Sequence, residues 1–271
     1  ECNHSLITND YYGSVLIRLG RYERAVEILK EKLTRGEHAK EVMGTLETLF
    51  DLAENYRLTK KFDEALSHAG KAVNMALDTG NGNWIFRVRY GLANIHYDTN
   101  KFKKAYDEYM RCVSSSSYLE NKLEFYTVIA NVWVQLGHCC KEIAIEEGDR
   151  INFEKAITYF MAAIDAGVSG TFLMAAHEGL GESYFHLGNY EKSKIHLSDT
   201  KKLLGNQKGP FADAYRFRIL KLYVEILRKQ GQINEAISNL PCLKDLALTD
   251  DKLLREYFEL ELDFLSSIST Q

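Results

Sequence analysis

The chain has 271 residues, of which 45% are hydrophobic and 27% charged, and its formal net charge at pH 7 is −4. This near-neutral charge, with no basic stripe, argues against direct contact with DNA or RNA. No apolar run approaches the roughly 20 residues that a membrane span needs, and no charged and then apolar leader opens the sequence. We therefore expect a cytoplasmic protein that contacts neither nucleic acid nor a membrane.

The cysteines support the same expectation. Their number is odd, and disulfide frameworks belong mainly to short secreted chains. Most of them stand at helical packing positions, so we expect reduced thiols. They are Cys2, Cys112, Cys139, Cys140 and Cys242.

Residues 6–39 contain the first of several helix–turn–helix patterns. Gly13 stands among apolar residues of helical period, Gly20 can end this helix in a left-handed turn, and Tyr22 begins a second apolar stripe. Because glycine has no side chain, Gly13 allows the second helix to approach the first closely.

Residues 46–79 and 86–118 repeat this pattern. The small residue of the first helix is Ala53 in one copy and Ala93 in the other, so the three small residues follow one another at steps of 40 residues. The minimal repeat of this kind has about 34 residues. We place the additional residues between the copies, where they lengthen the helices.

Residues 123–168 form an interrupted fourth copy with Ala130 at the small position. Residues 138–151 are inserted at its turn. The insert has a helix-forming composition up to Glu147. We expect it to extend the first helix of this copy and not to form a loop.

The clearest copy covers residues 171–204, with Gly181 at the small position. A divergent copy follows at residues 213–246, and we expect its second helix to stop at Pro241, since proline lacks the backbone donor of a helix interior. The acidic start and apolar stripe of residues 250–268 predict a C-terminal capping helix.

These copies resemble the tetratricopeptide repeat (TPR), because Leu180, Gly181, Tyr184 and Gly188 have the spacing of its packing residues. The long repeats are similar to those of kinesin light chains, the Pins/LGN polarity adaptors and the peptide-sensing regulators of Gram-positive bacteria. The resemblance implies an all-α fold. It would be a single right-handed superhelical solenoid over residues 1–271, with about six antiparallel helix pairs and the capping helix.

In such solenoids the first helix of each pair lines a concave groove, so the resemblance assigns groove positions. Asn94 and Asn131 share one position in consecutive repeats, where a carboxamide can both donate to and accept from a peptide backbone. Tyr90 and Tyr97 flank Asn94 and offer apolar area with a polar tip. We expect an extended peptide or partner segment to be held there. The predicted contact residues are Arg87, Tyr90, Asn94, Tyr97, Thr127, Asn131, Gln135, Glu178, Glu182, Arg218 and Lys221.

The C-terminal wall of the groove is predicted to be basic. TPR domains that hold chaperone C-termini have a lysine and an asparagine on their first helix, where this chain has Asp10 and Ser14. We therefore do not expect a chaperone tail as the partner. The cations of the C-terminal wall are Arg218, Lys221, Arg228 and Lys229.

No pattern in the sequence supports catalysis, a cofactor or a metal. His138-Cys139-Cys140 is the only cluster of potential metal ligands in the sequence, and adjacent helical residues diverge by about 100°, so they do not converge on one zinc ion. No Ser/His/Asp or Cys/His signature is present. We expect a protein that is not an enzyme.

Two functions remain open. The first is a scaffold or adaptor that binds a partner protein. The second is a peptide-pheromone-sensing domain similar to those of Rap-type and PlcR-type bacterial regulators, with an N-terminal effector module that is missing before Glu1. A homodimer formed through the outer faces or the capping helix is a further possibility, for which Tyr257, Phe258 and Phe264 would offer apolar area.

Overall fold

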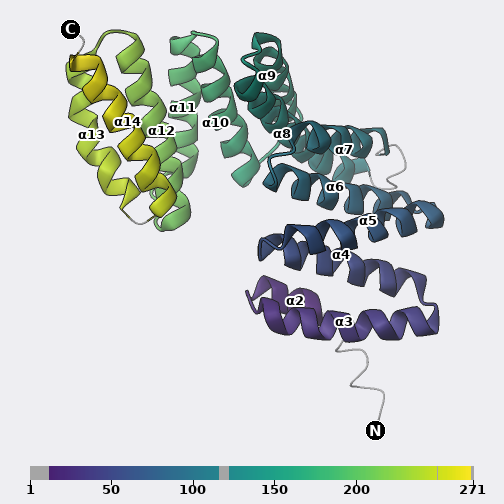
Figure 1. Ribbon diagram of the computed structural model, residues 1–271. Coiled ribbons are helices and arrows are strands. Elements are labelled where there is room, and N and C mark those ends of the chain that lie inside the picture. Colours follow the sequence, from purple (N-terminus) through teal and green to yellow (C-terminus); the bar gives the residue numbers. More distant parts are fainter. Residues whose placement is uncertain (1–11, 116–121, 249, 270–271) are drawn as a thin grey trace. The chain divides into compact units, whose positions relative to one another are not determined.

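The computed structural model describes residues 12–115, 122–248 and 250–269. These residues form thirteen α-helices and no strand, which confirms the all-α prediction (Figure 1). None of the described helices is both long enough and apolar enough to cross a membrane. The bounds are α2 Tyr12–Arg18, α3 Tyr22–Ala39, α4 Val42–Leu58, α5 Phe62–Thr79, α6 Gly82–Asp98, α7 Phe102–Ser115, α8 Lys122–Glu147, α9 Arg150–Asp165, α10 Gly170–His186, α11 Tyr190–Leu204, α12 Pro210–Lys229, α13 Ile233–Ala247 and α14 Asp251–Ser269.

The helices belong to two compact units, an N-terminal unit (Glu1–Cys139) and a C-terminal unit (Cys140–Gln271), and α8 contributes to both. In the N-terminal unit, α2 pairs with α3, α4 with α5 and α6 with α7. In the C-terminal unit, α10 pairs with α11 and α12 with α13. Connections of a few residues join the members of each pair, so the two helices run antiparallel.

The turns inside the helix pairs share one backbone conformation. Gly20, Gly188 and Gly231 have φ values of 71°, 78° and 76° at the turn, and Asn100 has 56°. Lys60 takes the same left-handed conformation at φ 59°, although it lacks the freedom of glycine. The recurring turn is therefore kept even where the sequence departs from glycine.

The five predicted small residues are buried. Ala53, Ala93 and Ala130 are at most 4% exposed, and Gly13 and Gly181 are also buried. A Cβ added to Gly13 would lie 2.5 Å from Leu29 Cδ2, and one added to Gly181 would lie 2.9 Å from Leu197 Cδ2. The side chain that fills the space next to the glycine is therefore Leu29 in the first copy and Leu197 in the fifth.

A second glycine of α10 serves a different contact. Phe160 of α9 is fully buried, and its ring occupies the space next to Gly179. A Cβ on Gly179 would lie 2.3 Å from Phe160 Cζ and 2.5 Å from Cε2. Gly181 therefore allows α11 to approach α10, and Gly179 allows α9 to approach it from another side.

The inserted residues continue α8 as a helix as far as Glu147, as their composition predicted. Gly148 follows with φ 67°, and Asp149 then caps α9 by accepting a hydrogen bond from the backbone N–H of Ile151 at 2.9 Å. Cys139 and Cys140 are 0% and 2% exposed. The adjacent cysteines are therefore packing residues of α8.

The prediction that a helix stops at Pro241 is wrong. Pro241 lies inside α13, which continues to Ala247. Proline removes one helical hydrogen bond, but Leu243 and Ala247 beyond it are fully buried in a cluster with residues of α12 and α14. Burial of these side chains holds the second half of α13 in the helical conformation.

The C-terminal segment forms the predicted capping helix, α14. Its apolar stripe packs into the same cluster, where Leu253, Tyr257, Leu260 and Phe264 are at most 7% exposed. Helix α14 thus covers the apolar surface of the α12/α13 pair.

We expect Gly179→Ala to destabilise the protein by about 1–2 kcal/mol. Crowding of a packed core typically costs about 1–3 kcal/mol, and the gain in helix propensity returns up to about 1 kcal/mol. Gly70→Ala is the matched control, because Gly70 also lies inside a helix, α5, but a Cβ there meets nothing within 4 Å. We expect this control to raise the free energy of unfolding by about 1 kcal/mol. Urea unfolding measures both, and equal stabilisation by the two substitutions would contradict the packing described at Gly179.

Candidate functional site

In the N-terminal unit, the predicted groove side chains of α4 and α6 contact one another. Arg57 of α4 forms ion pairs with Glu54 at 2.7 Å and with Asp98 of α6 at 2.5 Å. Hydrogen bonds and ion pairs with these carboxylates raise the pKa of Arg57, against the opposing effect of burial. The guanidinium of Arg87 lies over the Phe50 ring, 4.7 Å from its centroid. Charged residues of this face are therefore already partnered.

Asn94 is fixed by a residue that the sequence reasoning missed. Tyr109 of α7 is 1% exposed, and its hydroxyl donates a hydrogen bond to Asn94 Oδ1 at 2.5 Å. With Oδ1 engaged, Nδ2 is the polar atom of this half-buried carboxamide that has no partner in the described part of the chain. Nothing in the spacing of the sequence indicates that the hydroxyl of Tyr109 reaches Asn94.

Tyr90 connects α6 with α8. Its side chain is hydrogen-bonded to Gln135, and its ring lies edge to face against Tyr109 with 5.6 Å between the centroids. Burial raises the pKa of Tyr90, and the bond to Gln135 opposes this rise. Two predicted site residues from different repeats, Tyr90 and Gln135, are therefore brought together.

Asn131 lies one turn before Gln135 on α8 and is half-buried. Its carboxamide has no side-chain hydrogen-bond partner among the residues that the structure describes. Tyr97 packs edge to face on Phe102 at 5.2 Å. The side chain of Thr127 lies outside the described residues, so its predicted role stays a prediction.

In the C-terminal unit, the four predicted site residues Glu178, Glu182, Arg218 and Lys221 line one cleft of about 280 Å³. They come from α10 and α12. Glu256 of α14 completes the lining and was not predicted. The other lining residues are Phe185, His186, Leu197, Leu222 and Glu225.

The prediction of a basic C-terminal wall needs correction, because most of its cations are neutralised. Arg218 pairs with Glu178, and Lys221 pairs with Glu256 at 2.8 Å. Arg228 pairs with Glu225 at 2.7 Å. Each of these three cations lies within ion-pair distance of a carboxylate that its own helix or a neighbouring one supplies, so the wall carries little net positive charge.

Glu182 is held by a buried lysine. Lys141 of α8 forms ion pairs with Glu182 at 2.6 Å and Glu142 at 2.8 Å, and its side chain is only 9% exposed. Burial alone lowers the pKa of Lys141. The two carboxylates raise the pKa by more than burial lowers it, so the net shift is upward. Burial also raises the pKa of Glu178, and Arg218 opposes that rise.

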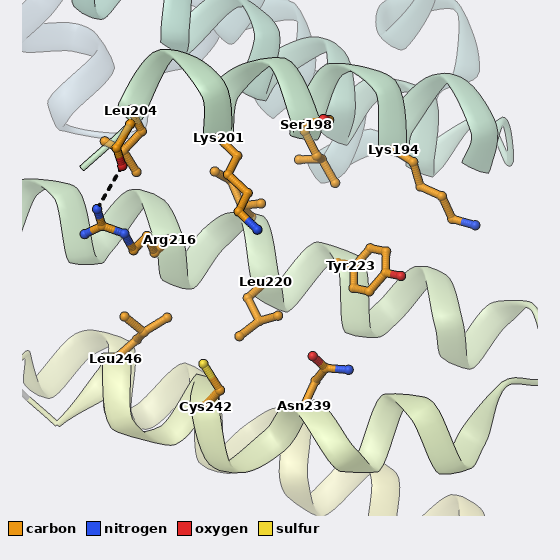
Figure 2. A pocket seen from close by; sticks show the side chains of 13 residues that line it. Lys194, Ser198, Lys201, Leu204, Arg216, Leu220, Tyr223, Asn239, Cys242 and Leu246 are labelled. Carbon is orange, nitrogen blue, oxygen red and sulfur yellow. Dashed lines mark hydrogen bonds between the residues drawn. The ribbon is translucent and has the colours of Figure 1, made fainter. Parts of the chain in front are cut away.

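A larger pocket, which the sequence reasoning missed, lies between α11, α12 and α13. It has a volume of about 550 Å³. Figure 2 shows Lys194, Ser198 and Lys201 of α11 on one side and Asn239 and Cys242 of α13 on the other. The lining residues recur at spacings of three and four along each helix, which places them on one face. They were not predicted because groove residues were assigned only to the first helix of each pair.

The residues named for a homodimer are only partly available. Tyr257 and Phe264 are 2% and 1% exposed, because they belong to the core beneath α14. The prediction that they offer apolar area is wrong. Phe258 is 45% exposed, and Leu262, one turn later, is 65% exposed. A homodimer remains a prediction, and Phe258 and Leu262 are the side chains of α14 that offer it exposed apolar area.

We expect Arg218→Gln to raise the pKa of Glu178 further, because it removes the cation that opposes the effect of burial. A carboxyl whose pKa is raised in the folded state is stabilising when protonated. The variant should therefore lose stability as the pH rises from the ordinary value near 4.5 through the raised pKa. Each unit of further shift removes about 1.4 kcal/mol at high pH.

Urea unfolding at several pH values measures this loss. Glu178→Gln/Arg218→Gln is the control, since it also lacks the cation of Arg218 but has no carboxyl at position 178 to titrate. The single variant should become less stable relative to the double variant as the pH rises. A difference that is independent of pH would contradict the account of this ion pair.

Residues 5–78 and 86–118 match tetratricopeptide repeat families. Comparison with curated proteins finds no matching relative. Solved structures with a similar fold include the apo form of the quorum sensor NprR from B. thuringiensis. The match has 16% identity and a TM-score of 0.71, and it covers 94% of this chain and 69% of that one.

Two further structures have the same fold. A Rap protein complexed with competence and sporulation factor has 14% identity and a TM-score of 0.61, and the match covers 97% of this chain and 75% of that one. A candidate kinesin light chain from Podosopora anserina with nearly identical TPR-like repeats has 14% identity and a TM-score of 0.57, covering 73% and 94%. Residues 5–78 and 86–118 are therefore tetratricopeptide repeats, and the chain as a whole is similar in fold to these solved structures.

Proposed function

We propose that this chain is a non-catalytic binding protein that holds an extended peptide or partner segment on the first-helix side chains of its N-terminal unit. The observation that supports this most strongly is the fixed carboxamide of Asn94. Tyr109 engages its oxygen at 2.5 Å. The two N–H donors of Asn94 are then left for a backbone carbonyl of the bound segment.

A second carboxamide lies on a neighbouring helix. Asn94 is one turn from Tyr90 on α6, and Asn131 is one turn from Gln135 on α8. The hydrogen bond between Tyr90 and Gln135 joins these two helix faces. Two carboxamides on joined faces suit an extended backbone, because main-chain hydrogen bonds repeat along it whatever the side chains are.

The same face of the N-terminal unit also carries the charged side chains Arg57, Glu54 and Asp98. These side chains are paired, so a charged ligand group has to displace an existing partner before it gains one. Neutral polar groups can bind at the edges of these pairs without that cost. We therefore propose a segment without a strong net charge, whose affinity depends weakly on salt.

A scaffold and a peptide sensor would use the same surface. The sensor is the second candidate, and the likeness to NprR over 94% of this chain supports it at the level of the fold. Amide hydrogen exchange separates the two. A sensor should change exchange rates in helices that do not touch the peptide, and a scaffold should change only those that do.

The binding proposal can be tested with peptides selected from a random display library on the intact chain. We expect Asn94→Ala and Asn131→Ala each to weaken the binding of a selected peptide by about 0.5–1.5 kcal/mol, the net contribution of one hydrogen bond. Fluorescence anisotropy at two salt concentrations measures the affinity. A library that yields no binder, or an unchanged affinity in the double variant, would contradict the proposal.

Two further variants make this test specific. Asn74→Ala is the matched control, because Asn74 is an exposed asparagine on the second helix of its pair, α5, and should leave the affinity unchanged. Tyr109→Phe keeps Asn94 but frees its carboxamide to rotate. It should weaken binding less than Asn94→Ala does, and circular dichroism should show that all variants remain helical.

A further inference from the structure

Two histidines and an aspartate from neighbouring helices come together in the C-terminal unit. His177 lies on α10, and His196 and Asp199 lie three residues apart on α11. His177 Nδ1 is 3.1 Å from His196 Nδ1 and 4.0 Å from Asp199 Oδ2. The three possible ligand atoms all lie within 4.8 Å of one another. All three residues are half-buried.

The separations are close to those of ligands around one metal ion. Zinc binds imidazole nitrogen and carboxylate oxygen at about 2.0–2.2 Å in a tetrahedral arrangement. Two ligand atoms on such an ion are therefore about 3.3 Å apart. The imidazole nitrogens already have nearly this spacing, at 3.1 Å, and Asp199 Oδ2, at 4.0 Å from His177 Nδ1, would have to move closer to bind the same ion.

We propose that His177, His196 and Asp199 form a binding site for a divalent transition-metal ion, with Zn²⁺ as its simplest occupant. Two imidazoles and one carboxylate suit Zn²⁺ and its neighbours in the first transition row, and they suit the hard ions Ca²⁺ and Mg²⁺ poorly. Three protein ligands leave one tetrahedral position for water or for a side chain of a partner.

Residues around the trio hold two of the ligands in place. The ring of Tyr184 stacks on His196, with 5.5 Å between centroids and an interplanar angle of 4°. Lys202 binds the other carboxylate oxygen of Asp199, Oδ1, at 2.9 Å. Such contacts orient metal ligands in known sites. Lys202 also competes with the ion for the charge of Asp199, so it lowers the affinity.

The protonation of the imidazoles fits metal binding. Burial lowers the pKa of both His177 and His196, which favours the neutral form with a free nitrogen lone pair. Without metal, one Nδ1 carries a proton and donates a hydrogen bond to the other Nδ1. With metal, both Nδ1 atoms bind the ion and both protons lie on Nε2, so the change is a tautomer shift of one ring.

A bound ion would connect α10 to α11, the helix pair in which Gly181 allows close approach. The sequence concealed the site, because the ligands stand 19 and 3 residues apart and match no zinc-binding spacing. The helical hairpin alone brings His177 opposite His196.

The site can be tested on the full chain with Cys2→Ser and Cys242→Ser as the background, which removes the exposed thiol of Cys242 as a competing ligand. Calorimetry with Zn²⁺ should give one ion per chain, and Co²⁺ should give the visible absorption of a tetrahedral complex with nitrogen and oxygen ligands. Both ions should raise the melting temperature. Mg²⁺ should neither bind in calorimetry nor raise the melting temperature.

His196→Gln and Asp199→Asn should each lower the affinity for Zn²⁺ by more than about 10-fold, since even loss of a residue that orients a ligand lowers metal affinity by about 10- to 100-fold. Lys202→Gln should strengthen it. His68→Gln is the matched control, because His68 lies on α5 of the other unit and should have no effect. Circular dichroism checks that each variant is folded. Equal Zn²⁺ affinity in all variants, or no tetrahedral Co²⁺ spectrum, would overturn the proposal and leave His177 and His196 as an ordinary hydrogen-bonded pair.

Discussion

The close approach of paired helices is the constraint on which the rest of this structure depends. In five of the copies it depends on a residue with little or no side chain at one point of the first helix. Gly13 and Gly181 meet this requirement with Leu29 and Leu197 packed where a Cβ would otherwise lie. Once the pair is closed, one face of the first helix is used for packing, and the remaining face is left to carry the groove side chains.

The sequence predicted this arrangement well because its signals are local. Small residues, turn residues and apolar stripes recur at fixed spacing, and each reports on a contact within one helix pair. The turn at Lys60 keeps the left-handed conformation because its backbone makes the same hydrogen bonds as the turn at Gly20, with the N–H groups of Lys60 and Lys61 donating to carbonyls at the end of α4. Pro241 was misjudged for the opposite reason, since burial of Leu243 and Ala247 by other helices outweighs the local preference of proline.

The candidate sites were harder to predict, because they depend on contacts between residues far apart in the chain. Spacing identified Asn94, but it could not show that Tyr109 fixes its oxygen. Spacing also identified the cations Arg218 and Lys221, but not the carboxylates that neutralise them. The pairing of His177 with His196 escaped notice because no spacing rule covers ligands on two antiparallel helices. Composition of a helix face thus predicts which groups are present, and only the packing decides which of them are free to bind.

The central claim is that the carboxamides of Asn94 and Asn131 bind the backbone of an extended segment. The most direct measurement is the NMR signal of their side-chain N–H groups as a selected peptide is added. The account predicts that both signals move with the same dissociation constant that anisotropy gives, and that the signal of Asn74 does not. Binding of the peptide with the Asn94 and Asn131 signals unmoved would contradict it.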